Sequence, residues 1–260
     1  MLCDGVGCAG YVWKYLRPAL TEHYQVVHWH YRGHGDTPMP RDRDHVAICD
    51  HADDAIAVMD HAGVERAIFV GHSMGVQVSL ESYRRHRARV AGLVLMCGAP
   101  GRPLGMTRNP ERAEFFLTTA QRIVSKAPGL FNGLLRSLLP TEMAYRIATW
   151  LEVDPEEVQK EDFMPYLQAM SRMDAHLFLD TLAAANQHSA VDLLPEIDIP
   201  ALIIGGSDDG FTSPVLSQLM YDQIADAEML IVERGSHTAP LEQPELVCNT
   251  VLDFLGRRLI

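Results

Sequence analysis

A serine stands between two glycines where a short apolar run gives way to a helical pattern. The segment reads Gly71-His-Ser-Met-Gly75 and directly follows Ala67-Ile-Phe-Val70. Flanking glycines let a strand and a helix approach closely through a strained turn, which exposes the serine hydroxyl at the carboxyl edge of a sheet. In this context the pattern predicts that Ser73 is a nucleophile. The alternative is a tight turn that carries no chemistry.

A serine hydroxyl is a weak nucleophile unless a base accepts its proton, and the base needs a carboxylate that fixes its tautomer. Asp208 and Asp209 follow the apolar run Ile203-Ile-Gly-Gly206, and His237 follows the next apolar run. Parallel strands end at one edge of a sheet, so we expect Ser73, one aspartate and His237 to meet there. Their chain order, Ser–Asp–His, is that of the nucleophile-elbow enzymes.

The elements that must position these residues alternate along the chain. Short apolar runs predict strands at 24–30, 67–70, 90–96, 201–204 and 229–232. Helical spacing of apolar residues predicts helices at 45–62, 74–86, 213–225 and 240–259. Strands separated by helices predict an α/β fold, with a mostly parallel sheet and helices on both faces.

Residues 102–190 interrupt this alternation. They contain no convincing strand, and their apolar spacing predicts helices at 111–125, 130–138, 142–151, 164–173 and 177–187. We therefore expect an α/β core of residues 1–101 and 191–260, with residues 102–190 inserted as a helical cap. Most apolar residues of the insert should pack it onto the core, and some should line a pocket above Ser73. The candidates are Phe115, Phe116, Leu117, Leu134, Leu135, Trp150, Phe163, Met164, Met170, Met173 and Phe178.

Charge and cysteine content bear on location and partners. The chain has 22 Lys and Arg against 34 Asp and Glu, a net charge of −12. An acidic surface repels phosphate, so we expect neither nucleic acid nor anionic membrane as a partner.

The five cysteines lack disulfide or zinc spacing, and no apolar run approaches the ~20 residues that span a bilayer. The N-terminal segment shows no export signal, so we expect a cytoplasmic protein.

Two other groups of residues have chemical potential. His28 and His30 share one face of an expected strand, and His34 is close in sequence, but no third metal ligand or acidic partner is obvious. We therefore expect hydrogen-bonded roles, and neither a metal nor a cofactor. The basic run Arg84-Arg-His-Arg-Ala-Arg89 stands at a helix end, where cations complement the helix dipole.

Over nearly its whole length the chain resembles the α/β-hydrolase superfamily. The resemblance rests on the order of the three candidate residues and on several quoted segments. Besides Gly71–Gly75, these are Tyr31-Arg-Gly-His-Gly35, Gly206-Ser-Asp-Asp209, and His237 followed by Glu242-Gln-Pro-Glu245.

The resemblance implies roles for particular residues. Asp209 is the expected acid, because the family's aspartate usually lies three residues beyond the glycine that ends the strand; Asp208 is the alternative. The backbone N–H groups of Met74 and Val6 are the expected oxyanion hole. Asp4 stands where relatives have histidine, and we expect its carboxylate to cap the amides of its turn. Relatives also have an antiparallel strand pair before this loop, so we expect either that the sheet lacks that edge or that the sequence is shortened at its N-terminus.

The expected function is that of a serine hydrolase which cleaves a carboxylic ester of a small to medium hydrophobic substrate through an acyl-enzyme. The same fold and triad also support hydrolysis of a carbon–carbon bond next to a ketone, a thioester or a lactone, and perhydrolase chemistry. A small-molecule receptor without turnover is the alternative from a different class.

Overall fold

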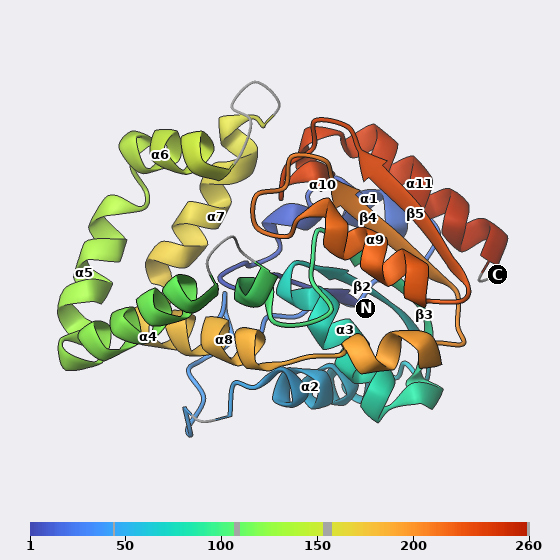
Figure 1. Ribbon diagram of the computed structural model, residues 1–260, viewed down its shortest axis with the longest axis horizontal. Helices are drawn as coiled ribbons and strands as arrows, with labels where there is room; N and C mark the ends of the chain where they lie inside the picture. Colours follow the sequence, from blue (N-terminus) through green and yellow to red (C-terminus); the bar gives the residue numbers. More distant parts are fainter. Residues whose placement is uncertain (44, 107–109, 153–157, 259–260) are drawn as a thin grey trace.

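Five parallel strands lie side by side in chain order. The computed structural model describes residues 1–43, 45–106, 110–152 and 158–258. Within this part of the chain the order is β1-β2-β3-β4-β5, and every neighbouring pair is parallel (Figure 1). The strands are β1 (Leu2–Cys3), β2 (Ala67–His72), β3 (Val90–Met96), β4 (Ala201–Gly206) and β5 (Ala227–Val232). The predicted α/β fold with a parallel sheet is confirmed.

Both faces of the sheet are covered by helices. On one face Phe69, Leu93 and Ile203 pack into a layer with α2 (Ile48–His61), α3 (Met74–Arg85) and α9 (Pro214–Gln223). Their sequence neighbours on the other face pack with α1 (Leu16–Thr21) and α11 (Pro244–Arg258). Two-sided burial explains why these strands are continuous apolar runs rather than alternating ones.

Three strands are longer than predicted. β2 continues through Gly71 to His72, and β4 continues through Gly206. β5 begins at Ala227 rather than at Met229. In β2 and β4 the sequence pattern ends at the first glycine, because glycine has low strand propensity, although the ladder to the neighbouring strand continues.

The strand expected at 24–30 is not formed as predicted. Only a single bridge joins this segment to the sheet, between Leu2 and His28, together with a hydrogen bond of 2.9 Å from Leu2 N to Val27 O. Its neighbour β1 offers only two residues for pairing, so the ladder ends almost at once. The apolar pattern in this segment therefore reflects partial burial rather than regular pairing.

The helix expected at 240–259 is divided in two. α10 spans Ala239–Glu242, and α11 begins at Pro244. Gln243 between them has φ −127° and ψ 64°, which is not helical. A proline clashes with a helical conformation of the residue before it, so Pro244 ends the first helix and starts the second.

Among the described residues, five α-helices stand between β3 and β4, in the stretch where the sequence predicts an insert. They are α4 (Pro110–Lys126), α5 (Pro128–Leu138), α6 (Glu142–Glu152), α7 (Lys160–Arg172) and α8 (Ala175–Gln187). Figure 1 shows them beside the sheet, with α4, α5 and α6 farthest from α11. The division into core and cap at residues 102 and 190 stays a prediction. None of the described helices is long and apolar enough to cross a membrane.

The first turn of α3 lies directly against the end of β1. A Cβ atom added to Gly75 would overlap the carbonyl oxygen of Cys3 and would lie 2.9 Å from that of Asp4. Both obstacles are backbone atoms that cannot rotate away. Glycine at this position therefore sets how closely helix and strand approach.

We expect Gly75→Ala to lower the free energy of unfolding by about 3 kcal/mol, because the added methyl group must displace backbone. Gly133→Ala is the matched control, since a Cβ there meets nothing within 4 Å. The control should raise stability by up to about 1 kcal/mol through helix propensity. Urea unfolding of both variants measures the difference, and equal stabilities would contradict the packing argument.

His51 of α2 is buried without a hydrogen-bond partner among the described residues. The ring of His51 is fully buried, its centroid is 4.7 Å from that of Tyr31, and neither ring nitrogen has a partner within the described chain. Burial, followed by the nearby charges of His34 and Arg32, lowers the pKa of His51 to about 3. The folded protein therefore holds this ring neutral over a pH range in which the unfolded chain protonates it.

Stability should depend on pH through this ring. Between its ordinary pKa of 6.5 and its folded pKa of about 3, the unfolded state binds the extra proton. The free energy of unfolding then falls as the pH falls, by about 1.4 kcal/mol per pH unit. His51→Leu should remove this part of the slope. Urea unfolding of both proteins across this range is the test, and parallel curves would show that His51 does not contribute.

Candidate active site

Ser73 occupies a strained turn between β2 and α3. Its backbone angles, φ 56° and ψ −118°, lie outside the regions that non-glycine residues usually adopt. The Ser73 N–H donates a hydrogen bond of 3.0 Å to the carbonyl of Met96 and so fixes the turn to β3. A Cβ at Gly98 would lie 2.6 Å from the Ser73 carbonyl oxygen, so this glycine gives the turn its room.

The structure brings together three of the predicted residues at the carboxyl edge of the sheet. His237 Nε2 lies 3.0 Å from Ser73 Oγ, and His237 Nδ1 lies 2.9 Å from Asp209 Oδ2. With Nδ1–H donating to the carboxylate, Nε2 is free to accept the serine proton. Asp208 is exposed and accepts a hydrogen bond from Ser207 Oγ at 3.0 Å, so Asp209 is the aspartate that contacts the imidazole.

Hydrogen bonds fix the carboxylate of Asp209 in an ionised state. Its Oδ1 accepts the N–H groups of Phe211 and Thr212, both at 2.8 Å, and its Oδ2 accepts Thr212 Oγ1 at 2.7 Å. Burial alone would raise the pKa of Asp209. The charge of His237 and the hydrogen bonds from His237 and Thr212 outweigh burial and lower that pKa below its ordinary value.

A second buried carboxylate holds the loop on both sides of His237. Glu242 on α10 accepts the Ser236 N–H and the Thr238 hydroxyl, each at 2.7 Å, and it also accepts the Ser236 hydroxyl. From the opposite side, His72 Nε2 lies 2.9 Å from the carbonyl oxygen of His237. The backbone of the His237 loop is therefore tied to both α10 and β2.

Sequence reasoning missed three residues around the imidazole. Thr212 and Glu242 act through side-chain hydrogen bonds, and His72 contacts the His237 backbone. A signal was present for Glu242, because hydroxyl residues flank His237 on both sides and a carboxylate follows within one helical turn. No comparable signal marks Thr212.

The two expected oxyanion donors flank Ser73. Met74 is the first residue of α3, and the first N–H groups of a helix have no partner within it. Val6 lines the same cavity as Ser73, and a Cβ at its neighbour Gly5 would lie 3.1 Å from Ser73 Cβ. The N-terminal loop therefore packs directly against the nucleophilic turn.

The carboxylate of Asp4 is engaged within its own loop. It accepts hydrogen bonds from the Gly10 N–H at 3.0 Å and from the indole N–H of Trp13, and it lies 3.1 Å from His28 Nε2. These contacts agree with the expected role of capping backbone amides. The carboxylate also contacts two side chains, those of Trp13 and His28. Both oxygens of the Asp4 carboxylate are thus occupied by hydrogen bonds within the protein.

Asp4, His28 and His30 form one compact group of potential metal ligands. Their ligand atoms lie within 4.8 Å of one another. The acidic partner that seemed absent from the sequence is Asp4, 24 residues before His28. His30 Nδ1 accepts the Asp36 N–H at 3.1 Å, and both oxygens of Asp4 accept hydrogen bonds. The group therefore fits a hydrogen-bonded network that holds the N-terminal loop.

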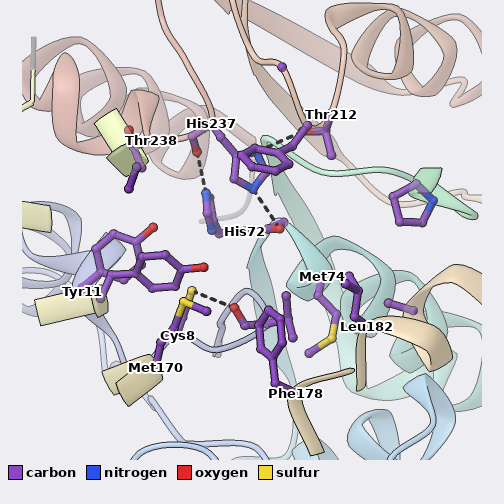
Figure 2. A pocket seen from close by; sticks show the side chains of 18 of the residues that line it. Cys8, Tyr11, His72, Met74, Met170, Phe178, Leu182, Thr212, His237 and Thr238 are labelled. Atoms are coloured by element: carbon purple, nitrogen blue, oxygen red, sulfur yellow. Dashed lines mark hydrogen bonds between the residues drawn. The ribbon is translucent and has the colours of Figure 1, made fainter. Parts of the chain in front are cut away.

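A cavity of about 560 Å³ opens in front of Ser73 and His237. In Figure 2, His237 lies between Thr212 and His72, while Cys8, Met170 and Phe178 line the opposite wall. The lining is mainly apolar, and no Asp, Glu, Lys or Arg of the described chain is part of it. It consists of Val6, Cys8, Tyr11, His72, Ser73, Met74, Gln77, Ala99, Pro103, Leu104, Leu139, Ala144, Ile147, Ala148, Phe163, Tyr166, Leu167, Met170, Phe178, Leu182, Ala185, Gly210, Phe211, Thr212, His237 and Thr238.

Only some of the apolar insert residues named from the sequence line this cavity. Phe163, Met170 and Phe178 do so, whereas Phe115 and Phe116 are exposed. Leu117, Leu134, Leu135, Met164 and Met173 are also absent from the lining. The side chain of Trp150 lies outside the described part of the structure. Helical spacing shows which helix faces are apolar, but not which element each face meets.

The chain is similar in sequence to proteins that are named as hydrolases. The chain is 24% identical over 264 residues to a putative carbamate hydrolase RutD from Stutzerimonas stutzeri, covering 99% of this chain and 91% of the relative. It is 28% identical over 210 residues to a 2-hydroxy-6-oxononadienedioate/2-hydroxy-6-oxononatrienedioate hydrolase from a Pseudomonas species, covering 80% and 69%.

Solved structures show the same fold. The enol-lactonase from Burkholderia xenovorans superimposes with a TM-score of 0.75 at 22% identity, covering 98% of this chain and 90% of that one. The family model described as the alpha/beta hydrolase fold matches residues 1–244. With that match over most of its length, the chain belongs to the α/β-hydrolase family.

Proposed function

We propose that this protein is a serine hydrolase that cleaves a carboxylic ester of a small to medium hydrophobic substrate through an acyl-enzyme. The observation that carries the proposal is the hydrogen-bonded series Ser73–His237–Asp209 at the wall of an apolar cavity. A nucleophile, a base and an orienting carboxylate in contact are what acyl transfer requires. Membership of a hydrolase family supports the same reaction class.

In the proposed mechanism His237 accepts the hydroxyl proton while Ser73 Oγ attacks the ester carbonyl. The negative oxygen of the tetrahedral intermediate accepts hydrogen bonds from the N–H groups of Met74 and Val6. The intermediate collapses by breaking the bond to the alkoxy group, which leaves as an alcohol with the proton from His237. Water, deprotonated by the same imidazole, then hydrolyses the acyl-enzyme. Asp209 stays ionised and stabilises the imidazolium in both halves.

The cavity supports a neutral, apolar substrate. Its lining is mainly apolar and includes no described cationic side chain. Burying a carboxylate without a cation or several donors costs several kcal/mol. A dicarboxylate, as in the dioate that names one relative's substrate, would therefore lack a charged partner in this cavity. The uncharged polar side chains of the lining include Tyr11, Gln77 and Thr238.

A carbamate is the second candidate substrate class, and similarity to relatives named as putative carbamate hydrolases favours it. The same attack on a carbonyl would form a carbamoyl-enzyme, which hydrolyses slowly because the nitrogen donates electrons to the carbonyl. Comparing an N-alkyl p-nitrophenyl carbamate with the ester of equal chain length distinguishes the two. Faster steady-state turnover of the carbamate would replace the ester proposal.

The cytoplasmic location and the absence of nucleic-acid partners stay predictions.

Substitution of the proposed catalytic residues should separate their roles. Ser73→Ala and His237→Ala should each lower kcat by about 10⁶-fold, and the double variant by no more, because the residues act as one unit. Asp209→Asn should cost about 10⁴-fold through loss of the correct tautomer. Asp208→Asn is the matched control and should keep most activity. A larger loss in the Asp208 variant than in the Asp209 variant would contradict the assignment.

Acyl-chain preference should reflect the cavity. We expect initial rates with p-nitrophenyl esters to rise from acetyl to medium chains, with Ser73→Ala as the inactive control. Esters of equal length that end in a carboxylate should have kcat/KM values at least ~100-fold lower, because the charge loses its water without gaining a cation. Equal rates for neutral and anionic esters would contradict the neutral-substrate proposal. Burst release of p-nitrophenol would exclude a receptor without turnover.

A further inference from the structure

The side-chain amide of Gln77 belongs to the wall of the cavity. Gln77 lies on α3, four residues after Ser73, and both residues line the cavity together with His237. Residues four apart lie on one face of a helix, about 6 Å apart along its axis. Gln77 is only 2% exposed, so its amide must find hydrogen bonds inside the protein or from a molecule in the cavity.

The contacts of the amide nitrogen fix which way this amide faces. Gln77 Nε2 donates to the carbonyl oxygen of Ala185 at 2.8 Å and lies 3.4 Å from His188 Nδ1. A carbonyl oxygen only accepts hydrogen bonds, so the amide atom beside it must be the nitrogen. His188 agrees with this orientation, because its Nε2 lies 3.1 Å from Glu81 Oε2 and donates there, which leaves Nδ1 as an acceptor.

The nitrogen of this amide joins two helices. Ala185 stands in the last turn of α8, where backbone carbonyls lack partners within the helix. Gln77 caps one of them and so ties α3 to α8. Met74 and Leu182, about one turn earlier on the same two helices, also line the cavity (Figure 2). The nitrogen therefore has a structural role, which the amide oxygen does not share.

The oxygen of the amide is open to the cavity. Gln77 Oε1 accepts no hydrogen bond from any residue that the structure describes. It is also not one of the polar atoms that are sealed from solvent without a partner, whereas Nδ1 of His72, another residue of the lining, is one of them. Because Gln77 is buried and lines the cavity, the cavity is the space from which its Oε1 can be reached.

The two threonines of the lining already donate their hydroxyl protons within the protein. Thr212 Oγ1 donates to Asp209, and Thr238 Oγ1 donates to Glu242, each at 2.7 Å. Neither donor reaches Gln77 Oε1. A substrate that fills the cavity displaces water from this oxygen, so it must supply a donor or leave a buried acceptor unpaired.

We propose that Gln77 is a specificity-determining residue whose Oε1 accepts a hydrogen bond from a neutral O–H or N–H group of the substrate. The inference rests on the proposed hydrolase function and narrows its substrate class to esters that carry such a donor. The donor belongs to the substrate, because an amide oxygen has no proton to give. It is neutral, since no Asp or Glu of the described chain lines the cavity to pair with a cation.

The spacing of the two residues limits where the donor lies in the substrate. Gln77 is about one helical turn from Ser73, so the donor must be a few bonds from the carbonyl that Ser73 attacks. A hydroxyl on the third carbon of the acid meets this condition, and so does a hydroxyl on the second carbon of the alcohol. The chemistry that Gln77 recognises is the same in both halves of the ester.

Two pairs of esters test the proposal by pH-stat titration of the released acid. Ethyl 3-hydroxybutyrate and ethyl 3-methoxybutyrate place the group in the acid half, whereas 2-hydroxyethyl butyrate and 2-methoxyethyl butyrate place it in the alcohol half. Ethyl butyrate is the unsubstituted reference for both pairs. In at least one pair, the wild type should favour the hydroxyl ester over the methoxy ester and over ethyl butyrate by about tenfold in kcat/KM.

The preference should appear in KM. A hydrogen bond remote from the reacting carbonyl stabilises the bound substrate and the transition state alike, so kcat should change little. Without an acceptor in this apolar cavity, the hydroxyl would lose its water for nothing, and the hydroxyl ester would be a poorer substrate than ethyl butyrate. That order of the two esters in the wild type would overturn the proposal, if it held in both halves, without the need of any variant.

Gln77→Met is the direct substitution, because it keeps the length of the side chain and replaces the amide by a weakly accepting sulfur. It should lower the hydroxyl-to-methoxy ratio of kcat/KM about tenfold in the pair that the wild type discriminates. Any steric effect of the added methyl group persists in the variant. Loss of the tie to α8 alone would change both esters of a pair equally, so an unchanged ratio would assign Gln77 a purely structural role.

Gln121→Met is the matched control. Gln121 of α4 also ties its helix to α8, since its Nε2 donates to Asp180 at 2.9 Å, but it does not line the cavity. The control should keep the wild-type ratio. An equal loss of the ratio in both variants would overturn the proposal, because it would follow from loosening α8 rather than from removing an acceptor.

Binding to Ser73→Ala separates this inference from the hydrolase proposal. Calorimetric titration of this variant with the same esters should show the hydroxyl ester binding about tenfold more tightly than the methoxy ester. Adding Gln77→Met should abolish the difference. Turnover by the wild type without any hydroxyl preference would overturn the role of Gln77 and leave the hydrolase proposal intact. A preference in binding that depends on Gln77, without turnover by the wild type, would do the reverse.

Discussion

The strained turn at Ser73 is the constraint on which the site depends. A residue with φ 56° and ψ −118° keeps this conformation only where its surroundings leave no alternative. Here Gly75 allows α3 to lie against β1, Gly98 leaves room for the Ser73 carbonyl, and a hydrogen bond from Ser73 N to Met96 fixes the turn to β3. The core of the sheet thus holds the hydroxyl at the floor of the cavity.

Two buried carboxylates complete the arrangement from the other half of the chain. Asp209 after β4 holds the imidazole ring of His237, and Glu242 on α10 holds the hydroxyl residues on either side of it. Because β4 and β5 run parallel to β2, their carboxyl ends deliver these groups to the same edge. Parallel topology therefore brings together residues that lie 136 to 169 positions from Ser73 in the sequence.

Much of this arrangement follows from the sequence, because local patterns determine it. Apolar runs bounded by glycine mark the central strands, and the residues after them include Ser73, Asp209 and His237. The segment at 24–30 looks like a strand but pairs through a single bridge, because pairing depends on its neighbour β1. Contacts between distant residues, such as Asp4 with His28, have no local signature at all.

Choosing between Asp208 and Asp209 shows the same limit. Adjacent carboxylates have equal chemistry, and only the path of the loop turns one toward the imidazole and leaves the other exposed. The same limit applies to the cavity wall, because helical spacing identifies which helix faces are apolar but not which elements those faces contact. Phe163 and Phe116 belong to equally apolar stripes, yet one lines the cavity and the other is exposed.

The central claim is that Ser73 is a nucleophile activated by His237. Covalent labelling with diethyl p-nitrophenyl phosphate, followed by intact-mass and peptide mass spectrometry, tests it most directly. Attack by the serine oxygen on phosphorus expels p-nitrophenolate and leaves one diethylphosphoryl group on the enzyme. We predict a single modification, located on Ser73 and formed far more slowly in His237→Ala. A folded wild-type protein that stays unlabelled, or that is labelled at another residue, would contradict the account.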